Sequence, residues 1–229
     1  MSFFEMYELP ILRWVHIVAM VYWLGGEWGV FQTSFHVVNR KLAMEERKRH
    51  METAYRIDIL ARTGIIILLP LGMHMGNIWG IQPFGGSFLV SMWVFYFAWL
   101  GLCWAAYYHR ETDLGLRLTK ADELIRYFVI PAVFVAAVAS LLGYGPFSAE
   151  MGQKWFSIKL MIFSMLLVIG LLLRYIMREW TTMFRILAQG KNEEVENKLD
   201  TSIRFGRRLA YIYWIGILTV AFFGAVKPM

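Results

Sequence analysis

Cysteine is almost absent from this chain, since Cys103 is the only one among its 229 residues. A single cysteine excludes an intramolecular disulfide, a zinc site built on thiolates and a haem attached through a Cys-X-X-Cys-His motif. It also excludes an iron–sulfur cluster, because those clusters are held by several cysteine thiolates. Charged residues are scarce as well, at 17% of the chain, against about a quarter in soluble domains. Any cofactor must therefore be held by other residue types in a largely apolar protein.

Hydrophobic residues make up 58% of the chain and gather in runs close to the length that crosses a bilayer. We therefore expect an all-α, polytopic bundle of six transmembrane helices, forming one integral membrane domain over residues 1–229. The stretch 177–208 should extend the last two helices, with Asn192 as the N-cap of the second. The predicted spans are Ile11–Phe31, Ile59–Trp79, Phe88–Tyr108, Tyr127–Gly145, Trp155–Leu173 and Leu209–Val226.

Basic residues give the predicted orientation. The connections after the first, third and fifth spans hold 18 of the 23 Lys and Arg residues. The positive-inside rule then places these connections in the cytoplasm and both termini outside. We expect a multi-pass protein of a bacterial inner membrane, with the lipid bilayer as its surroundings. The net charge of +6 reflects this topology, and nucleic acid is not an expected partner because the charges are spread over three loops.

Two histidines carry the functional prediction. His16 lies early in the first span and His74 late in the second, so antiparallel helices place both at a similar depth below the outer surface. An intramembrane imidazole is costly and marks a functional site by default, although each ring could instead donate to a carbonyl of a neighbouring helix. We expect the pair to hold one haem b from its two axial sides. Arg13 and Lys159 lie at the same level and could contact the haem propionates, and Lys159 could also snorkel outward.

Other polar residues of the spans suggest further pairs. His36 and His109 fall at the cytoplasmic ends of the first and third spans and are candidates for a second haem or metal site, or are ordinary interfacial histidines. Glu27 and Arg62 should reach a similar depth on antiparallel helices, which predicts a structural ion pair, with a proton-relay role for Glu27 as the alternative. His50 lies in a charged stretch and is expected to be solvated.

Methionine offers a different chemistry. Met20 follows His16 by one helical turn, and Met73 and Met75 flank His74. Thioether and imidazole together form a plausible Cu(I) site, so copper is the alternative cofactor. Methionine is also an ordinary apolar filler of helix bundles.

Several motifs resemble the small membrane protoporphyrinogen oxidases that bind haem b. They are WVHIVAMVYWLGG with His36 after it, YRIDILARTGIIILLPLGM, KWFSIKLMIFSMLLVIGLLLRYIMREW, KNEEVENK and the final VKPM. The resemblance covers roughly residues 1–80 and 153–229 and implies a haem site near Trp155 and Lys159. The Arg-Trp-X-His start and the WLGG turn are also similar to copper-resistance D-type and cytochrome-type urate oxidase membrane domains.

The chain departs from that family in ways that shift the expected function. The third and fourth spans have no counterpart in its four-helix members, and Ser157 stands where a histidine is usual. Two axial histidines would also leave no open site on the iron. We therefore expect a membrane cytochrome b that transfers electrons, with a periplasmic or membrane redox partner, as a homo-oligomer or as a subunit of a larger complex. A protoporphyrinogen-oxidase-like enzyme and a copper-handling protein are the alternatives.

Overall fold

The computed structural model describes residues 3–150 and 152–228, which form six α-helices and no β-strand. All six are long and apolar enough to cross a membrane, so the predicted all-helical, multi-pass architecture is confirmed. Their bounds are α1 Phe3–Val37, α2 Met44–Ile78, α3 Ser87–Tyr108, α4 Asp113–Leu141, α5 Lys154–Leu187 and α6 Glu193–Val226.

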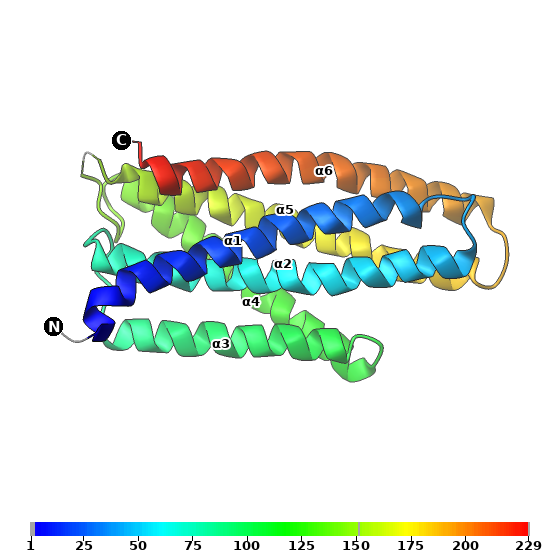
Figure 1. Cartoon of the computed structure of the whole chain (residues 1–229), viewed down its shortest axis with the longest axis horizontal. Coiled ribbons are helices and arrows are strands. Elements are labelled where there is room, and N and C mark those ends of the chain that lie inside the picture. The colour runs from blue at the N-terminus through cyan, green and yellow to red at the C-terminus, as the bar shows by residue number, and fades with distance from the viewer. Residues whose placement is uncertain (1–2, 151, 229) are drawn as a thin grey trace.

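The helices run up and down, so that α1 begins and α6 ends at the same end of the bundle (Figure 1). Helix α1 packs along α2, and α5 packs along α6. Helix α4 packs on α5, and α3 packs on both α2 and α4. Helix α1 also approaches α6, but much less closely than it approaches α2. The end of the bundle where α1 begins and α6 ends is called the terminal end, and the opposite end is called the loop end.

Four of the helices have 34 or 35 residues, well beyond the roughly 20 that a membrane span requires. Helices α1, α2, α5 and α6 continue past α3 and α4 toward the loop end (Figure 1), where they share a small hydrophobic core with Trp180, Phe184 and Leu199 at its centre. The stretch 177–208 therefore extends two helices as predicted. Asn192 caps α6 by accepting a hydrogen bond from the backbone N–H of Val195.

A salt bridge joins α2 and α6 within this extension. The buried Arg47 of α2 donates to both carboxylate oxygens of Glu196 of α6, at 2.6 and 2.9 Å, and its Nε donates to the carbonyl of Val37. Paired guanidinium–carboxylate hydrogen bonds of this kind are among the stronger polar interactions in proteins. The pair fixes the position of α6 against the turn between α1 and α2.

Small residues allow the close contact between α1 and α2. A Cβ at Gly64 would clash with the carbonyl oxygen of Ala19, and one at Gly26 would lie 2.8 Å from the Cβ of Ala61. Helix pairs in membranes commonly rely on small residues in this way, because van der Waals contact replaces the hydrophobic effect there. The two glycines therefore set the spacing of the α1–α2 pair.

We predict that Gly64→Ala lowers the free energy of unfolding by about 1–3 kcal/mol, because the added methyl group must push α1 away. Thermal unfolding in detergent, followed by circular dichroism, measures the effect. Gly101→Ala is the matched control, since a Cβ at that position meets nothing within 4 Å. Equal stability of the two variants would show that the α1–α2 spacing is not set at Gly64.

Candidate functional site

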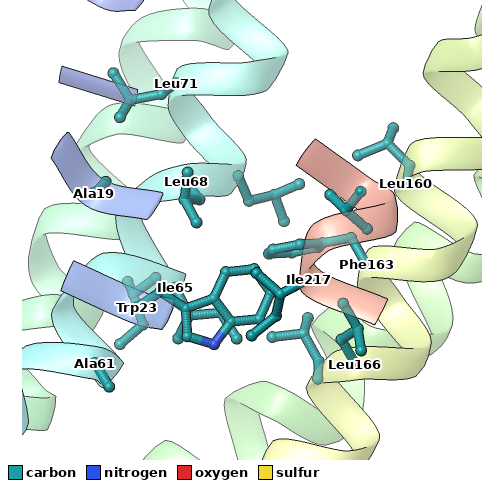
Figure 2. Packing of buried hydrophobic residues seen from close by; sticks show 14 of the residues in the cluster. Ala19, Trp23, Ala61, Ile65, Leu68, Leu71, Leu160, Phe163, Leu166 and Ile217 are labelled. Atoms are coloured by element: carbon teal, nitrogen blue, oxygen red, sulfur yellow. The ribbon is translucent and has the colours of Figure 1, made fainter. Parts of the chain in front are cut away.

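A cavity of about 470 Å³ lies at the terminal end of the bundle, between α1, α2, α5 and α6. It exists because α1 lies tightly on α2 and leaves space toward α6. Its inner wall is built by Trp23 and Leu68 on one side and by Phe163 and Ile217 on the other (Figure 2). The rings of Trp23 and Phe163 meet edge to face, with centroids 5.7 Å apart. Mostly apolar cavities of this size are typical of sites for small molecules and cofactors.

His16 is the only histidine among the described residues that line this cavity. Its Nδ1 is buried and has no hydrogen-bond partner in the part of the chain that the structure describes. Gly72 of α2 lies opposite, where a Cβ would be 3.6 Å from the Cε1 of His16. A buried polar atom without a partner is uncommon in proteins and calls for a ligand or another explanation.

Three cationic side chains line the same cavity: Arg13, Lys159 and Lys227. Among the side chains that the structure describes, those of residues 6–150 and 152–228, none of them forms a salt bridge with an acidic side chain. The Nζ of Lys227 lies 3.9 Å from the ring centroid of Trp79. Burial, followed by the charge of Arg13, lowers the pKa of Lys227. Three cations without acidic partners beside an apolar space favour a ligand that is apolar with acidic groups at one edge.

Lys159 fits into the bundle because of a glycine on α6. Its Nζ lies 2.6 Å from the position that a Cβ of Gly224 would take. The predicted residues Arg13, His16 and Lys159 therefore meet at one cavity. From the sequence, Lys227 was not predicted to be a site residue. Its position directly after the last span, on the same side as Arg13, could have indicated that it belongs to the site.

His74 does not face this cavity. The indole N–H of Trp93 on α3 donates to its Nδ1 at 3.2 Å, and its Nε2 lies 3.2 Å from a carboxylate oxygen of Glu8. Gly72 faces His16, and two further residues rotate an α-helix by about 200°, which turns His74 toward α3. The structure therefore does not bring His16 and His74 together across one space.

The methionines near the histidines are also divided. Met20 and Met75 line the large cavity with His16, whereas Met73 packs against the hydrophobic core outside it. No group of three or more His, Cys, Asp or Glu side chains in the described part of the chain could hold a metal ion. The soft ligands available in the cavity are therefore one imidazole and two thioethers.

The second histidine pair has a different arrangement from the one expected. His36 stacks on His50, with ring centroids 4.3 Å apart and planes inclined by 17°. His109 is the exposed C-cap of α3. From the charged stretch around it, His50 was expected to be solvated. In the structure, α2 already begins at Met44 and runs antiparallel to α1. This antiparallel start of α2 brings His50 to His36.

Arg62 has a different partner from the predicted one. It forms a salt bridge with Asp58, one turn earlier on α2. Glu27 lies in the same region and lines a second cavity, of about 50 Å³, together with Asp58 and Arg174. In place of the expected Glu27–Arg62 pair, Arg62 pairs within its own helix. This is possible because α2 begins at Met44, before the predicted span, and so includes Asp58.

A buried ionic cluster was missed from the sequence. Asp122 of α4 is completely buried and accepts hydrogen bonds from the indole of Trp99 at 2.7 Å, from Arg126 and from Arg174 of α5. By sequence alone, Arg126 and Arg174 count among the loop cations that set the topology. Their place inside the bundle follows from α4 beginning at Asp113 and α5 continuing to Leu187. The sequence could have indicated the cluster, because Asp122 and Arg126 are four residues apart and so lie on one face of a helix.

Comparisons of the chain with models of protein families, with curated proteins and with solved structures found no match.

We predict that Asp122→Asn destabilises the protein by about 3–5 kcal/mol, because it leaves two buried guanidinium groups without their shared carboxylate. Unfolding in detergent measures this. Asp200→Asn provides the control, since Asp200 also pairs with an arginine four residues later, Arg204, but at the exposed surface, where such pairs contribute about 0–1 kcal/mol. A similar small effect of both substitutions would contradict the assignment.

Proposed function

We propose that this protein is a membrane cytochrome of the b type, which holds haem b in the large cavity and transfers electrons through it. The observation that carries the proposal is that His16, whose buried Nδ1 has no partner among the described residues, lines an apolar cavity together with three cations. Haem bound there would supply reversible one-electron chemistry. By the distribution of basic residues, the cavity faces the periplasm of a bacterial inner membrane, where a redox partner could reach its mouth.

The residues present fit haem b in three respects. Trp23, Leu68 and Phe163 offer apolar and aromatic walls for a macrocycle. His16 offers an imidazole for the iron, the usual axial ligand of b-type and globin-like sites. The three cations of the cavity offer positive charge to two propionates, which would otherwise be expensive in these surroundings. The cavity thus provides a ligand for the iron, enclosure for the ring and neutralisation for the acidic edge.

The second residue that would hold the iron differs from the one expected from the sequence. Because His74 faces α3, and because Met20 projects from the same face of α1 as His16, the remaining thioether on a facing helix of the cavity is that of Met75. Histidine–methionine ligation raises the reduction potential relative to two histidines. We therefore propose that His16 and Met75 would be the two ligands of the iron.

Two alternatives use the same residues. His16, Met20 and Met75 could together bind Cu(I), since thioether and imidazole are ligands it prefers. A haem with His16 alone would leave one position open and would suit the protoporphyrinogen-oxidase-like enzyme that the sequence motifs resemble. The spectrum and metal content of the purified protein separate copper from haem, and the spin state of a haem separates the filled from the open sixth position.

The ligand assignment predicts different results for the two histidines. His16→Ala should abolish the haem spectrum or strongly reduce haem occupancy, because it removes the imidazole that lines the cavity. His74→Ala should keep the haem and its spectrum, because it removes only contacts with Trp93 and Glu8. Absorption spectra of both purified variants test this. Loss of the spectrum in His74→Ala but not in His16→Ala would reverse the assignment.

Lys159 should tune the redox potential. A cation beside the haem stabilises the reduced state, so Lys159→Met should lower the midpoint potential by tens of millivolts, equivalent to about 1 kcal/mol at an effective dielectric constant near 20. Redox titration measures the shift. Lys154→Met is the matched control, since Lys154 is exposed at the first turn of α5. Equal potentials for Lys159→Met and the unmodified protein would remove Lys159 from the site.

A further inference from the structure

A second, smaller cavity lies nearer the loop end than the large one. Its volume of about 50 Å³ is enough for one or more water molecules. Glu27, Asp58, Arg174 and Arg207 are the charged side chains that line it. Its lining also includes Ser34, further along α1 toward the loop end. The small cavity therefore extends toward the opposite side of the bundle from the large cavity.

Among the described residues, Glu27 is the one carboxylate lining this cavity that has no partner. Asp58 is engaged by Arg62, and Arg174 is engaged by Asp122. Arg207 donates from its Nε to the hydroxyl of Ser34 at 3.0 Å. Within the described part of the chain, no salt bridge or hydrogen bond joins the Glu27 side chain to another residue.

The groups around Glu27 come from every helix packed near it. Asp58 and Arg62 belong to α2, Arg174 to α5, and Arg207 and Tyr213 to α6. The three arginines favour a negative Glu27, whereas Asp58 and the apolar surroundings favour a neutral one. Glu27 is therefore near both positive and negative groups and lines a cavity large enough for water. A carboxyl in such surroundings can change its protonation state when a further charge appears nearby.

The large cavity is one helical turn away from Glu27. Trp23 precedes Glu27 by four residues, about 6 Å along the helix, and lines the large cavity. Its indole N–H donates to the hydroxyl of Tyr213 at 3.0 Å, and Tyr213 lines a third cavity with Asp58, Arg62 and Arg174. A unit charge about 10 Å away changes the proton affinity of a carboxylate on the order of tenfold at an effective dielectric constant near 20.

We propose that Glu27 is the proton acceptor of redox-linked proton uptake by this protein. When one electron from a donor enters the redox group in the large cavity, the Glu27 carboxylate takes one proton from water in the small cavity and becomes a neutral carboxyl. Oxidation reverses both steps, so charge balances in each direction. The inference rests on the proposed function. It adds that the electron and the proton enter from opposite ends of the bundle.

Redox titration of the haem-loaded protein between about pH 5 and pH 9 tests the proposal. Proton uptake on reduction makes the midpoint potential fall as the pH rises, and a tenfold coupling corresponds to about 59 mV in total. Glu27→Gln should remove this dependence and hold the potential at its acid-side value, because the amide imitates the neutral carboxyl. Glu179→Gln is the control, since Glu179 is exposed on α5, and it should behave like the unmodified protein.

The same wild-type pH dependence in Glu27→Gln would overturn the proposal. Infrared spectroscopy of the haem-free protein supplies a readout that does not need the cofactor. One component of the carboxyl C=O absorption that titrates with pH should be lost in Glu27→Gln, whereas Glu179→Gln should keep that component as the unmodified protein does. If the Glu27 band titrates but the protein binds no haem, the proposed function is wrong, although Glu27 is still a titrating group. If the protein binds haem but the band is still present in Glu27→Gln, the proposed function stands and the assignment of proton uptake to Glu27 is wrong.

Discussion

The unequal spacing of helices α1, α2 and α6 is the constraint on which the site depends. Gly26 and Gly64 let α1 lie in backbone contact with α2, so α1 cannot also close on α6. The space that remains at the terminal end is the large cavity. On α6, Ala221 contributes only a small side chain to this space, and Gly224 leaves room there for the side chain of Lys159. Helix packing thus creates the site before any polar residue contributes to it.

Polar groups inside the bundle fall into two sets with different consequences. Toward the loop end, Asp122 with its two arginines and Asp58 with Arg62 are neutralised within the protein, which makes burial of these charges tolerable. Toward the terminal end, the three cations of the large cavity have no acidic partner among the described residues. The first set stabilises the fold, and in the proposed function the second set would be neutralised by an acidic ligand. Glu27 lies between them.

The sequence predicted the helices well because bilayer-length apolar runs report them directly. It also predicted that His16, Arg13 and Lys159 share one level, since depth follows from position along a helix. It did not predict rotation, and so it placed His74 opposite His16. The cavity-lining residues Leu68, Leu69, Gly72 and Met75 repeat at helical spacing along α2, and His74 falls out of phase with them. Asp122 was missed because the predicted fourth span began at Tyr127, well after the helix begins at Asp113.

Absorption spectroscopy of the purified protein in detergent, oxidised and then reduced with dithionite, is the decisive test of haem binding. We expect a Soret band and, on reduction, the sharpened visible bands of a low-spin b-type haem, with one haem per chain. A protein without a Soret band after expression with ample haem supply would show that the cavity does not hold haem, and stoichiometric copper in the same preparation would assign the cavity to copper instead.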